Sequence, residues 1–131
     1  MRERLFIVVL TLGLMAAPTW TYAAEEPGVI ELAAPRAAER GEAFQVEITT
    51  GQLPRGARLR LLTENGEILG GVAPFPPTAR STTATVPVPR SAMADGRLRL
   101  RMQVEEPGVP PRPPRPGEVE RVDLFVVPRS Q

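Results

Sequence analysis

The chain has 131 residues and a formal net charge of +1, all of its basic residues are arginine, and it contains neither histidine nor cysteine. This length allows one domain, and the balanced charge argues against broad attraction to nucleic acid or to anionic membranes. The missing residue types exclude Ser-His-Asp and Cys-His nucleophilic sites, lysine Schiff bases and the usual ligands of zinc, copper and haem. We therefore expect neither a metal nor another cofactor.

The start of the chain has the pattern of a secretory signal peptide. Two arginines precede an unbroken apolar or small run over residues 5–17, and Thr21 and Ala23 place small side chains before a cleavage position. An uncleaved membrane anchor is the alternative, but the run is shorter than the roughly 20 residues that span a bilayer. Without cysteine, the chain suits a bacterial periplasmic or secreted protein better than an animal one. The predicted organisation is a signal peptide at residues 1–24 and one domain at residues 25–131, with no membrane span after cleavage.

After residue 24, short segments alternate apolar and polar residues, which is typical of half-buried β-strands. Seven strands are predicted, over residues 29–32, 44–49, 58–61, 67–70, 82–88, 97–104 and 121–126. Asn65-Gly66 predicts a type I′ hairpin turn, because both central positions of that turn need a positive φ. Pro87 and Pro89 cannot donate ladder hydrogen bonds, so the strand over residues 82–88 should lie at a sheet edge.

Seven short strands separated by turns predict an all-β sandwich of two sheets. Here the chain resembles bacterial immunoglobulin-like and fibronectin-III-like domains. The resemblance rests on the strand number and on residues 42–48 after Gly41, which look like the second strand of such domains. It implies an immunoglobulin-like sandwich over about residues 28–128, in which the third, sixth and last strands are neighbours in one sheet.

Pairs of carboxylates are the remaining candidates for enzymatic chemistry. Glycosidase-type catalysis needs two carboxylates that face each other across a cleft. Glu25-Glu26 and Glu105-Glu106 are instead sequence neighbours beside prolines, which indicates solvated loop charge. We expect a protein that is not an enzyme, with a hydrolase that uses only carboxylates as a remote alternative.

Arginines recur at the polar positions of the strands predicted to be neighbours. If the predicted sheet is correct, six of them point outward from one face, with Asp123 as the one acid that can be placed there: Arg58, Arg60, Arg97, Arg99, Arg101 and Arg121. Arginine suits bidentate recognition of carboxylates, so this arginine face is a candidate docking site for an acidic partner. The alternative is a solvated outer face over which acidic loop residues fold.

Residues 105–117 (EEPGVPPRPPRPG) form a proline-rich loop between the last two predicted strands. Its composition predicts a stiff, extended polyproline II segment that lies outside the strand ladders. Prolines alternate there with Arg112 and Arg115, as in ligands of aromatic-lined grooves, so the loop is a second candidate contact site. A solvated spacer is the alternative.

These features favour an exported, non-enzymatic binding or accessory module that acts through protein–protein contacts in a periplasmic or secreted assembly. Its partner would be another exported protein, acidic if the arginine face binds it, and not a nucleic acid. The alternative function is a structural or chaperone-like cell-envelope protein that offers a strand edge to a client.

Overall fold

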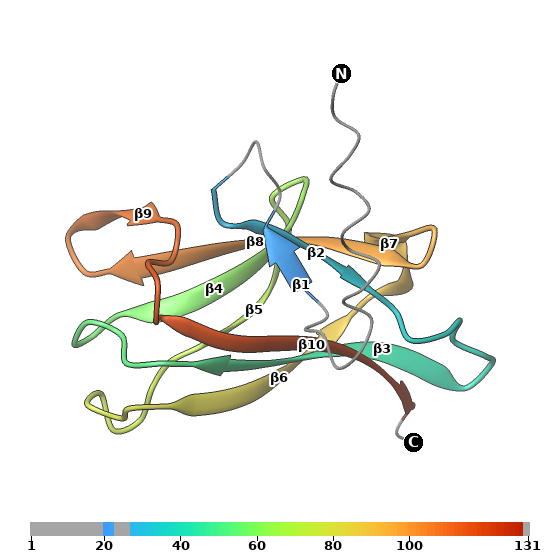
Figure 1. The fold of residues 1–131 in the computed structure, drawn as a ribbon, viewed down its shortest axis with the longest axis horizontal. Helices are drawn as coiled ribbons and strands as arrows, with labels where there is room; N and C mark the ends of the chain where they lie inside the picture. The colour runs from blue at the N-terminus through green and yellow to red at the C-terminus, as the bar shows by residue number, and fades with distance from the viewer. Residues whose placement is uncertain (1–19, 23–26, 130–131) are drawn as a thin grey trace, which may run out of the picture.

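The described part of the chain, residues 20–22 and 27–129 of a computed structural model, forms two antiparallel β-sheets that lie face to face (Figure 1). The first sheet has the order β1 (Trp20–Tyr22), β2 (Val29–Ala33), β8 (Arg97–Glu106), β4 (Arg58–Thr63) and β5 (Ile68–Val72), and β7 (Met93–Ala94) and β9 (Val109–Arg112) also pair with β8. The second sheet has the order β10 (Val119–Pro128), β3 (Glu42–Thr50) and β6 (Thr82–Val88). A 3₁₀ turn, η1 (Arg90–Ala92), precedes β7. The predicted all-β, two-sheet sandwich is confirmed.

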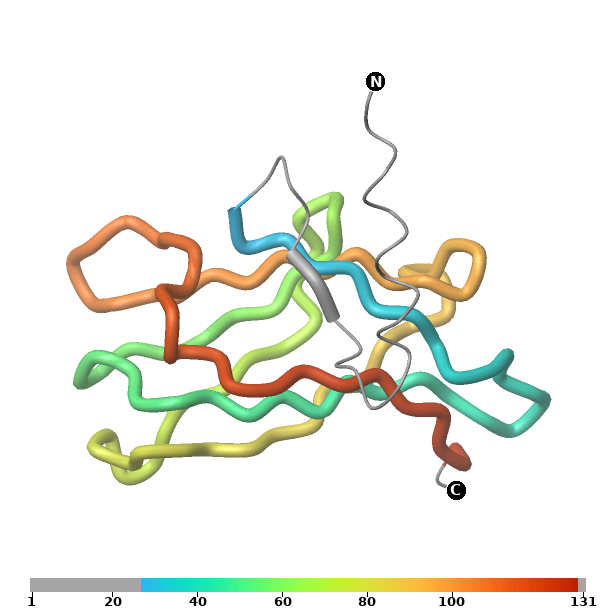
Figure 2. The backbone as a smooth tube through the Cα atoms, viewed as in Figure 1, coloured from blue at the N-terminus to red at the C-terminus, as the bar shows by residue number. Residues whose placement is uncertain are grey.

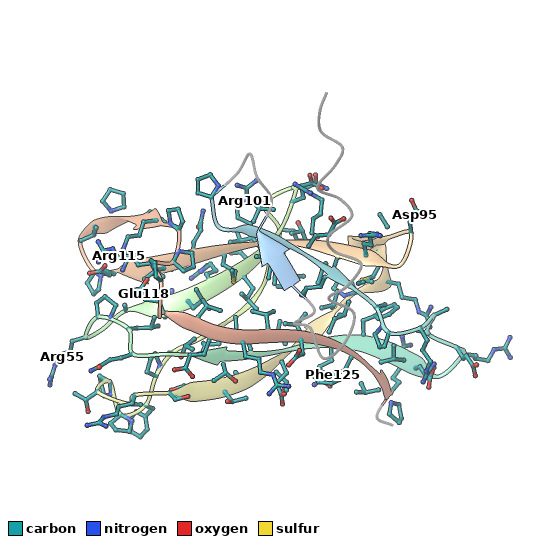
Figure 3. All side chains as sticks on the ribbon, in the orientation of Figure 1. Arg55, Asp95, Arg101, Arg115, Glu118 and Phe125 are labelled. Carbon is teal, nitrogen blue, oxygen red and sulfur yellow. The ribbon has the colours of Figure 1, made fainter. Side chains whose placement is uncertain are left out.

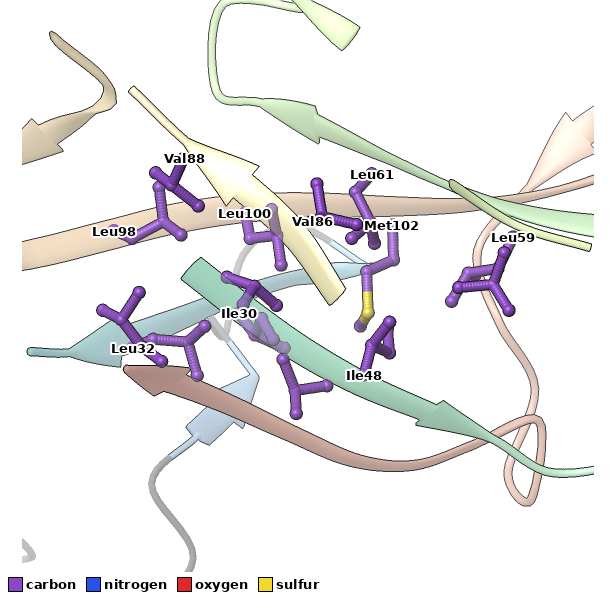
Figure 4. Packing of buried hydrophobic residues seen from close by; sticks show 14 of the residues in the cluster. Ile30, Leu32, Ile48, Leu59, Leu61, Val86, Val88, Leu98, Leu100 and Met102 are labelled. Atoms are coloured by element: carbon purple, nitrogen blue, oxygen red, sulfur yellow. The ribbon is translucent and has the colours of Figure 1, made fainter. Parts of the chain in front are cut away.

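Apolar side chains from alternate strand positions fill the space between the two sheets (Figure 4). In β8, Leu98, Leu100 and Met102 are buried, while the arginines between them face outward. In β3, Val46 and Ile48 are equally buried. Each such side chain stabilises the fold by about 1.5–3 kcal/mol when it leaves water, so the two-residue period decides which face of a strand turns inward.

The seven strands expected from the sequence are all present, and β6 lies at a sheet edge as predicted. Their bounds differ from the prediction by a few residues, mostly because pairing continues past the last buried residue. The sequence did not indicate β1, β7 or β9. These three strands are short, and β9 contains two prolines.

The partner of the last strand differs from the expectation. We expected it beside the third and sixth strands, but β10 pairs with β3 in the second sheet, and β2 occupies the position beside β8 (Figure 2). At the far end of β10, the Arg129 N–H donates to the Gly41 carbonyl at 2.7 Å, which extends the pairing with β3. The alternation of apolar residues in β10 requires a buried face, and either sheet provides one, so it could not identify the partner strand.

The two-residue type I′ turn occurs at a different hairpin from the one predicted. Asp95 (φ 54°) and Gly96 (φ 74°) both have positive φ and join β7 to β8, as in a two-residue type I′ turn. At the predicted site only Gly66 (φ 92°) is positive, and Asn65 is not. There the Gly66 N–H donates to the Thr63 carbonyl at 2.9 Å, which makes a longer loop that ends in a glycine. The hairpin between β4 and β5 is therefore confirmed, but its turn type was wrong.

Candidate functional site

The outer face of the first sheet carries five of the six arginines that were expected to share a face. Arg97, Arg99 and Arg101 face outward from β8, since the residues between them are buried. In the adjacent β4, Arg58 lies opposite Glu105 and Arg60 lies opposite Gln103. The term arginine face refers below to these five arginines.

Carboxylates are interspersed among the arginines of this face. Glu105 forms ion pairs with Arg60 at 3.0 Å and with Arg58 at 3.3 Å. Glu64 pairs with Arg99 at 3.0 Å, and Glu31 lies 3.9 Å from Arg97. The face is therefore a ladder of mixed charge, in which repulsion between arginines is relieved by neighbouring carboxylates. A partner that binds these arginines must compete with exposed ion pairs, which are individually worth about 0–1 kcal/mol.

The sixth arginine and the expected acid lie elsewhere. Arg121 and Asp123 are on β10, so they belong to the outer face of the second sheet, where their side chains form a 2.6 Å ion pair. Phe125, on the same face, is 41% exposed (Figure 3). The prediction that Arg121 joins the arginine face was wrong because it assumed that the last strand pairs beside β8.

A shallow hollow of about 250 Å³ lies at one end of the arginine face. Its lining includes Glu31, Glu64 and Glu67 together with Arg97 and Arg99. Two of these three carboxylates form ion pairs with the arginines, Glu64 with Arg99 and Glu31 with Arg97. Within residues 20–22 and 27–129, no group of three or more His, Cys, Asp or Glu residues is arranged to hold a metal ion.

The proline-rich loop, residues 105–117, is a hairpin arm attached to the first sheet. Strand β9 pairs with β8, with Arg112 opposite Val104 and Val109 opposite Glu106. The prediction that the loop lies outside the ladders was therefore wrong. Pro107-Gly108 supplies the turn that brings the chain back, and Pro110 and Pro111 lack the N–H groups that a longer ladder would need. The name proline arm is used below for residues 105–117.

Arg112 braces the base of the proline arm. Its guanidinium donates to both carboxylate oxygens of Glu118, with Nη1–Oε1 at 2.8 Å and Nη2–Oε2 at 2.9 Å, and also pairs with Glu106 at 3.3 Å. Glu118 is buried, and it accepts a further hydrogen bond from the Arg115 N–H at 2.7 Å. The hydrogen bonds from Arg112 lower the pKa of the Glu118 carboxyl, although burial opposes that shift.

The two arginines of the arm differ in exposure because one of them forms the brace. The Arg112 side chain is only 17% exposed and is committed to two internal carboxylates, whereas Arg115 is exposed (Figure 3). A tight backbone approach fixes the base from the other side, because the Gly51 N–H donates to the Glu118 carbonyl at 3.0 Å. A Cβ on Gly51 would collide with the carbonyl oxygen of Gly117. The arm thus leaves the sandwich in a fixed direction.

The arm and the arginine face meet. A hollow of about 210 Å³ is lined by Arg101 and Gln103 of β8 and by Pro111 and Pro113 of the arm. The two candidate contact features, separate in the sequence, therefore form one continuous surface at this end of the first sheet.

No family model, curated protein or solved structure shows a significant match to this chain. No helix within the described residues is long and apolar enough to cross a membrane. The chemistry of the surface is consequently the basis for a functional proposal. That surface offers stiff apolar prolines, one exposed guanidinium on the arm and mixed charge beside it, which are features of a contact surface.

Proposed function

We propose that the chain is an exported, non-enzymatic binding module that contacts another exported protein through the proline arm and the adjoining end of the arginine face. The observation that carries this proposal is the brace between Arg112 and the buried Glu118, which holds an exposed proline-rich hairpin in one orientation. A loop that served only as a spacer would need no such internal anchor.

The arm is suited to binding because its residues are exposed and its backbone is already restricted. Its exposed apolar residues are Pro107, Val109, Pro110, Pro111, Pro113 and Pro116. Binding through a segment that is stiff before contact loses less conformational entropy than ordering a flexible loop. Prolines of this kind dock on aromatic side chains, and Arg115 beside them can bind a carboxylate. The partner surface expected from this chemistry combines aromatic rings with acidic groups.

Substitutions on the arm test this proposal without disturbing the brace. A variant with Pro110→Ser and Pro111→Ser alters exposed residues only, whereas a deletion across residues 110–116 would remove Arg112 from Glu118. Pro87→Ser is the matched control, since Pro87 is an exposed strand proline in the second sheet. Purified wild type and variants are compared by capture of partners from a periplasmic extract and by urea unfolding.

We expect the arm variant to recover at least about tenfold less partner than wild type, equivalent to one or two lost contacts. The Pro87→Ser variant should match wild type. Combined Arg97→Ser, Arg99→Ser and Arg101→Ser substitutions should reduce recovery mainly at low salt, because exposed charges are screened over about 8 Å at physiological ionic strength. Equal recovery by wild type, the arm variant and the arginine variant would contradict the proposal.

A further inference from the structure

The outer edge of β2 is occupied by a segment that export is predicted to remove. Strand β2 pairs with β8 on one side and with β1 on the other, and β1 is the last strand of the first sheet. The residue pairs between β1 and β2 are Trp20–Leu32, Thr21–Glu31 and Tyr22–Ile30. All of β1 lies before the predicted cleavage position at Ala23 or Ala24. Cleavage there would leave β2 as the edge strand (Figure 1).

The hydrogen-bonding groups of that edge follow from the pairing with β8. The Met102 N–H donates to the Gly28 carbonyl at 2.8 Å, and the Ala34 N–H donates to the Gly96 carbonyl at 2.8 Å. In an antiparallel ladder, alternate residues bond to opposite neighbours, so Glu31 directs its N–H and C=O away from β8. Val29 and Ala33 share this direction. Three residues of β2 therefore present backbone donors and acceptors on the side where β1 lies.

The β2 edge contains no proline, and Glu31 is the one charged residue along it. Strand β6, at the edge of the second sheet, contains Pro87, which cannot donate to a ladder. Strand β2 has the sequence VIELA, without proline or a basic residue. Its core-facing residues, Ile30 and Leu32, are fully buried, and both lie opposite residues of β1. An edge of this composition is suited to accepting another strand.

We propose that loss of β1 turns the β2 edge into a binding site for an extended strand of an exported partner, which pairs antiparallel to β2 in the register that β1 has here. The strand expected there carries large apolar residues opposite Leu32 and Ile30 and a small polar residue opposite Glu31. The sequence Trp-Thr-Tyr of β1 has this pattern. The site is separate from the proline arm, so it goes beyond the function proposed above, and it rests on cleavage of the leader.

A second copy of the chain fits this edge less well than a partner strand. If two β2 strands paired about a two-fold axis with full overlap, Glu31 of one copy would lie directly opposite Glu31 of the other. Like charges directly opposite each other destabilise a pair of strands. We therefore assign the site to a different protein, and self-association through β2 is an outcome that would overturn this assignment.

The leader supplies a probe for the site. The chain has one tryptophan and one tyrosine, Trp20 and Tyr22, so the exported form contains neither, and the fluorescence of a peptide of residues 17–23 is free of background. The full chain is expressed, the processed protein is purified from the periplasm, and peptide binding is followed by fluorescence anisotropy. We expect saturable binding. A peptide with Thr21→Pro should bind at least about tenfold more weakly, because it loses the central edge hydrogen bond, while Thr21→Ala should bind like the original.

A matched pair of protein variants tests the other side of the pairing. Glu31→Pro removes the N–H that points to the edge and leaves the ladder with β8, whereas Glu31→Ala removes the same side chain and keeps the N–H. We expect Glu31→Pro to lose peptide binding and Glu31→Ala to retain it. Circular dichroism and urea unfolding report whether the Glu31→Pro variant is folded. If it is not, the comparison of the Thr21→Pro and Thr21→Ala peptides on wild-type protein still tests whether the β2 edge binds a strand.

Four results would overturn the inference. The first two are a peptide that shows no saturable binding, and Thr21→Pro and Thr21→Ala peptides that bind equally well. The third is a purified exported protein that still contains Trp20. The fourth is a dimer of the exported protein that the Glu31→Pro substitution abolishes. The arm variant with Pro110→Ser and Pro111→Ser should bind the peptide as wild type does. Failure of the β2 site and failure of the proline arm are therefore distinguishable.

Discussion

Leu100 shows at the scale of one residue how the sequence determines the fold. It lies in the middle of β8, opposite Ile30 of β2 and Thr63 of β4, and it is fully buried between the sheets. Its neighbour Arg99 faces outward and pairs with Glu64. Shifting β8 by one residue would exchange the environments of these two side chains.

Substitutions at these two positions should differ sharply in cost. Leu100→Ala removes buried methyl groups and leaves a cavity, so we expect a loss of about 2–5 kcal/mol in the free energy of unfolding. Arg99→Ala removes an exposed ion pair and should change stability by no more than about 1 kcal/mol. Urea unfolding of both variants beside wild type measures the two values. The reverse order would contradict the register of β8.

The ion pairs of the arginine face could not be predicted from the sequence. The sequence indicated the arginines, because they occupy the polar positions of strands in which polar and apolar residues alternate. Their carboxylate partners lie far away in the chain, with Glu64 in a turn and Glu31 in a strand that had not been assigned to either sheet. Such pairs depend on which strands are neighbours, and periodicity does not carry that information.

At the scale of elements, the strands were predictable and their partners were not. Alternation locates a strand such as β8 because one face of it must be buried. The alternation does not indicate which of the two sheets a strand joins, and for this reason β10 was assigned to the wrong sheet. The proline arm was recognised by composition, but its pairing was missed because Pro110 and Pro111 argue against a strand. Its brace was missed because nothing in the sequence indicates that Glu118 is buried against Arg112.

The brace of the arm gives a prediction about pH. The pKa of Glu118 in the fold lies below its ordinary value of 4.5, because Arg112 hydrogen bonds to the ionised form. The ionised carboxylate therefore stabilises the fold above about pH 4.5, and this contribution declines as the pH falls below that value. Glu118→Gln should cost about 1–3 kcal/mol at pH 7, as expected for lost hydrogen bonds to a charged group.

The stability difference between wild type and Glu118→Gln should shrink as the pH is lowered from 7 to 3. Urea unfolding over this pH series is the measurement. Glu106→Gln is the control, since Glu106 contacts the same guanidinium through a longer and more exposed ion pair. We expect its cost at pH 7 to be below about 1 kcal/mol. A constant difference for Glu118→Gln over the series would contradict the assigned brace.

At the scale of the whole molecule, the hydrophobic core that the structure describes lies after the predicted leader. Among residues 27–129, the buried members of the cluster run from Ile30 to Leu124. The first sheet keeps β2, β8, β4 and β5 when β1 is removed, and the second sheet is unchanged. Cleavage should therefore leave these strands in place and expose the outer edge of β2.

Cleavage of the predicted signal peptide is the prediction on which both the proposed export and the proposed β2 site depend. Expression of the full chain in a bacterial host should give a periplasmic protein whose intact mass corresponds to a first residue of Ala24 or Glu25. Replacing Ala23 by a bulky residue, Ala23→Phe, should slow cleavage, because the position before the cut requires a small side chain. A full-length species that pellets with membranes from the wild-type sequence would contradict export. A processed protein would lack the pairing of β1 with β2, and urea unfolding beside the uncleaved Ala23→Phe protein measures what that pairing contributes to stability.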